Sequence, residues 1–214
     1  MTGPEPEDLT ARARIRHAAL LQFGEHGFDR ATIRGIADAA GVSSGLVRHH
    51  FGSKEALRDA CDDYLIRVIG RINEQAMNDG VEGDANYVAL ASSSLGPYQR
   101  YLARSLVDGG TSAVFDEMVG MTEAWLVAAD ATRPDPPDVD RRSRATVITA
   151  MALSVTVLYQ HVSRGLGVDV FTPAGTERLA RVLLDFYSHP LLSMADAAKA
   201  RARLDGITKE FRDD

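Results

Sequence analysis

TIRGIADAAGVSSGLVRHHFGSK, residues 32–54, is the stretch of sequence that decides the fold. Apolar residues at positions 33, 36, 37 and 40 recur at helical spacing and predict a short helix with one apolar face. Thr32 is placed to cap its start, because a threonine hydroxyl accepts a backbone N–H that lacks a partner within the helix. Gly41 is placed to end it, since glycine enters the left-handed conformation at little cost.

A second short helix follows this glycine, and Ser43 or Ser44 is placed to cap it. Four apolar side chains can turn inward together: Val42, Leu46, Val47 and Phe51. Four small or basic residues are left facing outward: Ser44, Gly45, Arg48 and His49. Two short helices braced across a glycine turn, the second presenting small and basic groups, form the helix-turn-helix arrangement that enters the major groove of DNA.

At many fixed offsets, the sequence from about Ile15 to Leu57 resembles the N-terminal domain of the TetR family of bacterial transcriptional regulators. The matching positions are Phe23, Gly27-Phe28, Thr32, Ile36-Ala37, Ala40-Gly41-Val42-Ser43, Gly45, His50-Phe51 and Lys54-Glu55-Ala56-Leu57. The resemblance implies an all-α protein. A three-helix helix-turn-helix DNA-binding domain would precede a larger helical domain that binds a small molecule and forms a homodimer.

Eight residues are predicted to contact DNA: Thr32, Arg34, Ser43, Ser44, Gly45, Arg48, His49 and Lys54. Gly45 lets the backbone approach the groove closely. Arg48 departs from the family, which usually has a tyrosine there that touches a phosphate. An arginine can contact a phosphate or hold a guanine through two hydrogen bonds, so both roles stay open. His50 stands where an aromatic residue is often found, and it is predicted to pack rather than to read DNA.

The charge of the chain is divided between its two ends. The whole chain carries a net charge of −6, which taken alone argues against a nucleic-acid binder. Residues 9–58, however, hold eight arginine and lysine residues against four acids, a net charge of +4 that leaves −10 for the rest. A basic end on an acidic body is typical of a DNA-binding domain joined to a separate second domain.

Composition and cysteine content favour a cytoplasmic protein. The 214 residues are 45% hydrophobic, enough for one sizeable domain or two modest ones. The single cysteine, Cys61, excludes an internal disulfide; a buried small hydrophobe is favoured over a redox sensor. The first eight residues are polar and contain prolines, so no secretory signal is expected. The longest uncharged apolar stretch, 145–160, is shorter than the roughly 20 residues of a membrane span.

Three parts are predicted: a disordered lead over 1–8, the helix-turn-helix domain over 9–55, and a helical ligand-binding and dimerisation domain over 56–214. A helix over 54–78, capped by Ser53, would span roughly 37 Å and is the candidate mechanical link. The Gly-Val-Glu-Gly-Asp segment at 80–84 predicts a break. Only helices are predicted beyond it, over about 86–95, 97–108, 111–131, 140–164, 172–189 and 193–211.

The helices predicted over 140–164 and 172–189 carry apolar residues too broadly for one buried face. A helix that is apolar on two sides needs two packing partners. The resemblance implies that these helices pair with their copies as a four-helix dimer interface; two internal core helices are the alternative. Seven residues are assigned to this interface: Met151, Val155, Leu158, Leu179, Val182, Leu183 and Phe186.

A mostly apolar pocket with a few polar groups is predicted in the second domain, as the resemblance implies. Seven residues are candidates to line it: Tyr98, Tyr101, Arg104, Met121, Trp125, Tyr159 and His161. Arg104 points to an anionic or carbonyl ligand. The alternative is that the aromatic residues fill the core and that His161 is a buried histidine with satisfied hydrogen bonds.

The sequence offers no pattern typical of catalysis or of metal binding. It contains no nucleophile elbow, no Walker loop and no Gly-x-Gly-x-x-Gly. His49 and His50 would point about 100° apart on a helix, which suits no shared metal ion. We therefore expect neither enzyme activity nor a cofactor.

The function favoured by these observations is a homodimeric transcriptional repressor that a small molecule releases from a pseudo-palindromic operator. An activator stays open. So does a ligand-binding or interaction protein whose DNA-binding domain is not used.

Overall fold

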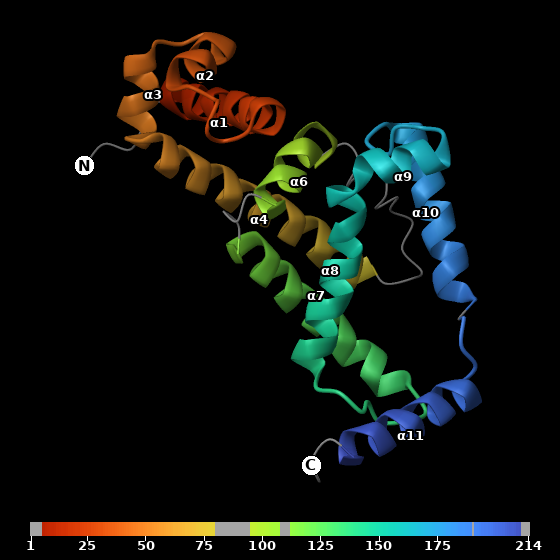
Figure 1. Cartoon of the computed structure of the whole chain (residues 1–214). Helices are drawn as coiled ribbons and strands as arrows, with labels where there is room; N and C mark the ends of the chain where they lie inside the picture. The colour runs from red at the N-terminus through yellow and green to blue at the C-terminus, as the bar shows by residue number, and fades with distance from the viewer. Residues whose placement is uncertain (1–5, 80–94, 108–111, 190, 211–214) are drawn as a thin grey trace.

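The computed structural model describes residues 6–79, 95–107, 112–189 and 191–210 (Figure 1). All regular elements in these ranges are helical, so the predicted all-α class is confirmed. The elements are α1 (Pro6–His26), α2 (Ile33–Ala40), α3 (Ser44–Phe51), α4 (Lys54–Asp79), the 3-10 turn η1 (Gly96–Tyr98), α6 (Gln99–Val107), α7 (Ser112–Thr132), α8 (Arg141–Val157), α9 (Tyr159–Leu166), α10 (Pro173–Ser188) and α11 (Met194–Glu210). The predicted break at 80–84 and nearly all of the helix predicted over 86–95 lie outside the described residues.

Local sequence signals place the starts of α2, α3 and α4 and the end of α2 as predicted, whereas α1 begins at Pro6, inside the lead predicted to be disordered. The hydroxyl of Thr32 accepts the Gly35 N–H at 3.0 Å, and Gly41 takes the left-handed conformation with φ of 67°. Ser43 caps α3, and Ser53 caps α4 by accepting the N–H of the residue three positions on, at 3.0 Å. These caps use backbone groups that have no partner inside the helix, which is why they can be read from sequence.

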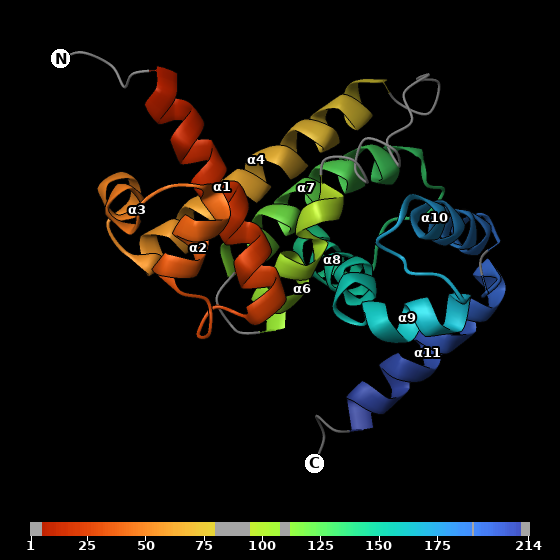
Figure 2. The ribbon, with the colours of Figure 1, turned by 90° about the horizontal axis from the view of Figure 1, so that it is seen from above.

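One core joins the N-terminal helices to α4 and α6. Ile15, Phe23, Ile36, Val47 and Leu57 are almost completely buried in it. Tyr101 of α6 belongs to the same cluster, and α1 packs along α6 (Figure 2). The helix-turn-helix therefore shares its core with α6 as well as with α4.

A second, smaller cluster lies where α4, α6, α7 and α8 meet. Its buried members are Leu102, Val114 and Leu153. The helices α7 and α8 lie side by side, and Arg144 of α8 donates two hydrogen bonds to the Asp130 carboxylate of α7 at 2.7 and 2.8 Å. This cluster holds α4 against the body of the molecule.

The single helix predicted over 140–164 is wrong, because the chain turns by 70° between α8 and α9 at Leu158. Three β-branched residues in a row, at positions 155–157, precede the turn and weaken the helix there. The Tyr159 ring then stacks on Phe171 with centroids 4.7 Å apart, which holds α9 in its new direction.

Within the described ranges, each helix is too short or too polar to span a bilayer by itself. Of these helices, only α8 and α9 combined, which meet at 70°, have the length and composition of a span.

The last two helices project from the rest of the chain. Among the described helices, α10 packs mainly against α9, and in Figure 1 it stands beside α8. An ion pair between Arg201 and Asp138, with nitrogen and oxygen 2.5 Å apart, ties α11 to the loop before α8. Both helices leave much apolar surface exposed.

Candidate functional site

The helix α3 presents a small, basic face to solvent. Val47 and Phe51 point into the core, and this fixes the rotation of the helix. Gly45, Arg48 and His49 are consequently exposed. Figure 1 shows α2 and α3 together at one end of the molecule, before the start of α4. The rotation that buries the apolar residues therefore produces the outward face predicted from the sequence.

The two capping hydroxyls border this face. Thr32 and Ser43 each use the hydroxyl oxygen to accept a backbone N–H, at 3.0 and 3.1 Å. A hydroxyl has one hydrogen to donate as well, and capping leaves that hydrogen available. Ser44, in the first turn of α3, is half-buried beside them. Each capping residue can thus hold its helix and donate to a phosphate or base at the same time.

Two arginines stand at the surface near these hydroxyls. Arg48 forms no ion pair within the described part of the chain. Arg34 lies 4.0 Å from the Asp38 carboxylate one turn on, and both side chains are largely exposed. An exposed pair at this distance contributes little stability, so Arg34 is free to exchange its partner for a phosphate.

Lys54 has a structural role that the sequence did not indicate. Its ammonium donates to the carbonyl oxygens of Phe28, Asp29 and Ala31 at 2.7, 3.3 and 3.0 Å. It also lies 4.4 Å from the centre of the Phe28 ring. Three acceptors match the three N–H donors of a lysine, so Lys54 fastens the loop between α1 and α2 to the start of α4. Its predicted phosphate contact stays a prediction.

Two further cations brace the same domain from the side. The Arg58 guanidinium lies 4.3 Å from the Phe28 ring centre, and the Arg12 guanidinium lies 4.8 Å from that of Phe51. Cations over aromatic faces are attracted by the ring quadrupole. Part of the basic charge counted over 9–58 therefore supports the fold of the domain.

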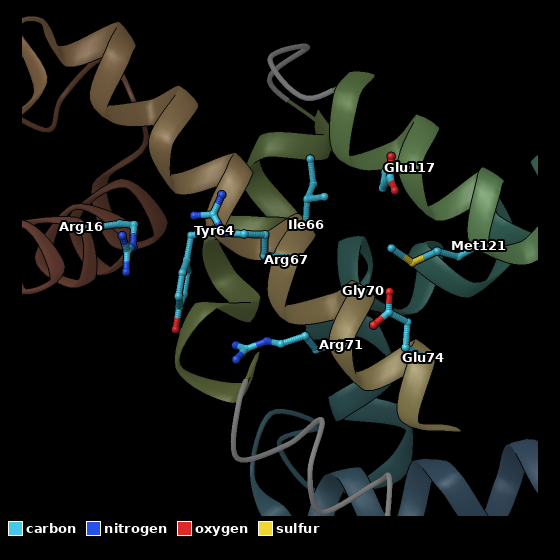
Figure 3. A pocket seen from close by; sticks show the side chains of 9 residues that line it. All are labelled: Arg16, Tyr64, Ile66, Arg67, Gly70, Arg71, Glu74, Glu117 and Met121. Atoms are coloured by element: carbon cyan, nitrogen blue, oxygen red, sulfur yellow. The ribbon is translucent and has the colours of Figure 1, made fainter. Parts of the chain in front are cut away.

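A cavity of about 560 Å³ lies along α4, between α1 and α7 (Figure 3). Its lining combines basic, aromatic, acidic and apolar side chains: Arg16, Tyr64, Ile66, Arg67, Gly70, Arg71, Glu74, Glu117 and Met121. The volume is in the range of small-molecule sites. Of the seven residues predicted to line a pocket, this cavity contains Met121.

A chain of aromatic contacts leads from this cavity to α1. The Arg16 guanidinium lies 4.3 Å from the centre of the Tyr64 ring. Tyr64 meets Tyr98 edge-on at 5.9 Å, and the Tyr98 hydroxyl lies 2.7 Å from Nδ1 of His17. Tyr98 is therefore next to the cavity wall without being part of its lining.

The other predicted pocket residues are dispersed, so the seven do not form one pocket in the described structure. Arg104 and Tyr159 line a separate depression of about 310 Å³. Trp125 is exposed and donates to the Asn73 side chain at 2.5 Å. His161 is exposed, contrary to the alternative of a buried histidine. Tyr159 lies beside the C-terminal end of α1 in the smaller depression, whereas the larger cavity borders α1 at Arg16.

Tyr101 belongs to the core, where its hydroxyl donates to the Asp62 carboxylate at 2.5 Å. Asp62 is only 7% exposed, and this burial raises its pKa to about 6, although the Tyr101 hydrogen bond and Arg58 act in the opposite direction. Cys61 is also buried, as predicted, and burial raises the pKa of its thiol. A thiol held in its neutral form is a poor nucleophile, which favours the packing role.

Arg104 of α6 forms hydrogen bonds to the end of α1. Its guanidinium donates to the carbonyl oxygens of Gly24 and Glu25 at 2.8 and 3.2 Å, in the last turn of α1. An arginine at this position satisfies carbonyls that have no partner inside the helix and complements the helix dipole. Arg104 thus joins α6 to the end of α1, whatever else it binds.

The residues predicted to form a dimer interface expose apolar surface on α8 and α10. Met151, Leu158, Val182 and Phe186 are 55%, 51%, 48% and 44% exposed. Val155, Leu179 and Leu183 are half-buried. The structure adds further large exposed apolar side chains to the same two helices and the segment that follows: Val147, Ile148, Leu184, Tyr187, Leu191 and Leu192.

Two family models match the chain. The model described as "Bacterial regulatory proteins, tetR family" matches residues 15–61, and "Tetracyclin repressor-like, C-terminal domain" matches 93–193. The HTH-type transcriptional regulatory protein RaaS of Mycobacterium tuberculosis is 40% identical over 156 residues, 71% of this chain and 72% of that protein. The HTH-type transcriptional repressor KstR2 of Rhodococcus jostii is 34% identical over 99 residues, 44% of this chain and 48% of that protein.

Solved structures share the fold at lower identity. The fatty acid degradation regulator FadR from Bacillus halodurans superposes with a TM-score of 0.63 at 20% identity, over 86% of this chain and 97% of that one. A gamma-butyrolactone receptor superposes with a TM-score of 0.57 at 23% identity, over 85% and 100%. Together with the matching domains and the relative that is 40% identical, the exposed helix-turn-helix leads to one conclusion: the chain belongs to the TetR family of bacterial regulatory proteins and is a DNA-binding transcriptional regulator.

Proposed function

We propose that the protein is a homodimeric cytoplasmic repressor that leaves a pseudo-palindromic operator when a small molecule occupies the cavity along α4. One observation carries the proposal. The same helix, α4, begins directly after the exposed α3 and, several turns later, forms a wall of the cavity. A ligand that shifts α4 therefore shifts the helix that reads DNA.

In this proposal α3 enters the major groove. Gly45 allows close approach, Ser44 and Arg48 face base edges, and His49 meets a phosphate. Thr32, Ser43 and Arg34 border the same face and contact the backbone. Lys54 acts indirectly as well, because it holds the loop that positions α2.

Dimerisation would place two such helices on one operator. The exposed apolar faces of α8 and α10 would be covered by their copies, which accounts for large apolar side chains that the described chain leaves in solvent. Two copies of α3 would then read half-sites about 34–36 Å apart, or a multiple of this distance.

Release follows from the differential affinity of the effector for two arrangements of α4. A ligand shifts the population only as far as it binds one arrangement more tightly than the other. α4 has 26 residues and is about 39 Å long, so a small rotation near the cavity becomes a larger displacement at α3. The names of KstR2, a repressor, and of the gamma-butyrolactone receptor support repression and small-molecule binding by analogy.

The test is footprinting of the purified protein on the intergenic DNA beside its gene, at several salt concentrations. We expect a protected palindrome, a steep fall of affinity with salt, and reduced transcription from a promoter that overlaps the palindrome. Weak binding without a protected palindrome would instead support the alternative of an unused DNA-binding domain. Increased transcription from the same template would identify an activator.

A further inference from the structure

We propose that the effector is an amphipathic monoanion whose charged group binds Arg67 and Arg71 of α4, with Arg16 of α1 at the same end of the cavity. This inference rests on the proposed function, because it names the chemical class of the molecule that fills the proposed effector site.

Arg67 and Arg71 are four residues apart on α4 and therefore share one face. Both line the cavity, and neither forms an ion pair with a carboxylate in the described part of the chain. Two like charges at this spacing repel each other and destabilise the helix slightly. An anion bound between them removes this repulsion and gains charge-assisted hydrogen bonds.

Arg16 supplies a third guanidinium from a different helix. It lies over the Tyr64 ring at 4.3 Å, which limits its movement and keeps it at the α1 end of the cavity. Figure 3 shows Arg16 and Tyr64 at the end near α1 and Glu117 and Met121 at the other. The cavity is thus basic and aromatic at one end only.

The opposite end defines the rest of the ligand. Ile66 and Met121 offer apolar surface, and the end of the Met121 side chain approaches α4 at Gly70. Glu74 and Glu117 line this end and would repel a second anionic group. A ligand with an apolar body and a single anionic group at one end would match both ends of the cavity.

The anion is not a phosphate of the DNA that α3 reads. Arg67 is 13 residues beyond Lys54 on a straight helix, about 20 Å along its axis from the start of α4. An anion at Arg67 and Arg71 contacts α4 and lies at the end of the cavity where Arg16 of α1 is held over Tyr64. The effector would then contact both α4 and α1, a helix of the DNA-binding domain.

Two fluorescent probes test the charge requirement on the full chain. 1-Anilinonaphthalene-8-sulfonate and N-phenyl-1-naphthylamine share one aromatic body, and only the first carries a sulfonate. The double variant Arg67→Ala/Arg71→Ala should weaken binding of the sulfonate about tenfold or more and change binding of the neutral probe less than about twofold. The double variant Arg178→Ala/Arg203→Ala, which removes two arginines from outside the cavity, should bind both probes as the wild type does.

Arg67→Lys/Arg71→Lys keeps the charges and should restore part of the lost affinity, which guards against misfolding of the alanine variant. An unchanged sulfonate affinity, or an equal loss for both probes, overturns the monoanion proposal. Operator release is measured separately, on the footprinted fragment. A protein that protects no palindrome contradicts the proposed function, yet the difference between the two probes still decides whether the cavity selects an anion.

Discussion

Arg48 is the residue of α3 whose proposed role in DNA reading is tested most directly by a substitution. It is exposed in the last turn of α3, and it forms no ion pair with another described residue that would hold it away from DNA. Its guanidinium has the planar donor pattern that fits either a guanine edge or a phosphate. A substitution distinguishes these two partners.

Replacing Arg48 by alanine should cost about 1–3 kcal/mol of binding free energy at one operator position if the arginine reads a guanine. Preference at that base pair should then relax, and other positions should keep theirs. If Arg48 contacts a phosphate, affinity should fall evenly across sequences and the salt slope should decrease by about one unit. Fluorescence anisotropy with single-base operator variants measures both; an unchanged affinity would remove Arg48 from the DNA interface.

Asp62 is the second residue that leads to a prediction, because burial moves the pKa of its carboxyl group away from the usual range. Burial raises its pKa from 3.8 to about 6. The folded state therefore binds a proton more readily than the unfolded state between these values. The free energy of unfolding rises as the pH falls through about 6, and this gain is complete below the unfolded pKa.

The variant Asp62→Asn should lack this dependence while its side-chain oxygen still accepts the Tyr101 hydrogen bond. The free energy of unfolding of the wild type should rise by about 1 kcal/mol relative to this variant when the pH is lowered from 8 to 5, as measured by urea unfolding. Tyr101→Phe removes a hydrogen bond that lowers the Asp62 pKa, so its transition should move above pH 6. Parallel curves for wild type and Asp62→Asn would contradict the assignment.

The junction of α1 and α6 is the feature of greatest consequence at the scale of elements. A Cβ added to Gly24 would lie 2.8 Å from the backbone nitrogen of Tyr101, so the two helices are in backbone contact. Arg104 joins the same two helices, and the contact of Tyr98 with His17 joins α1 to the turn η1 directly before α6. The helix-turn-helix is therefore attached to the second domain through α6 as well as through α4.

Gly24→Ala should lower the free energy of unfolding by about 1–3 kcal/mol, because the methyl group forces two backbones apart. Gly120→Ala is the matched control in α7, where no atom lies within 4 Å of the added Cβ. It should stabilise the protein by about 0.5–1 kcal/mol through helix propensity. Urea unfolding at one protein concentration compares them, and shifts of the same sign would contradict the close contact.

At the scale of the whole molecule, the described structure leaves large apolar side chains of α8 and α10 exposed, as the proposed dimer requires. Its two ends also differ in charge, with +4 over residues 9–58 and −10 elsewhere. A dimer through α8 and α10 would cover the apolar surface and leave the basic domains free for DNA.

Phe186→Glu should convert the proposed dimer to a monomer, because it places two carboxylates in an apolar interface. Loss of the second half-site contact should reduce operator affinity at least about 100-fold. Val127→Glu is the control, since Val127 is 53% exposed on α7, outside the proposed interface. Light scattering after gel filtration gives the mass of each variant; a dimeric Phe186→Glu, or a monomeric Val127→Glu, would place the interface elsewhere.

Features that depend on neighbouring residues were predictable from the sequence. The caps at Thr32, Ser43 and Ser53 and the turn at Gly41 each arise within four residues. The outward face of α3 follows from which side chains must turn inward. In contrast, Lys54 finds its carbonyl partners 23 to 26 residues away, and no local pattern reports such a contact.

The cavity likewise depends on contacts between segments that are far apart in the sequence. Its basic end needs Arg16 from α1 beside Arg67 and Arg71 from α4, and their meeting depends on how the helices cross. The turn at Leu158 depends on stacking between Tyr159 and Phe171, which periodicity does not reveal.

The sequence by itself determined most of the helices with their caps, the outward face of α3 and the division of charge, because helical periodicity, capping and net charge are properties of residues close together along the chain. Only the tertiary structure decided that Lys54 braces a loop, that Tyr101 belongs to the core, and that arginines from two helices share one end of a cavity. These contacts join segments far apart in sequence, and their geometry is set by packing rather than by local preference.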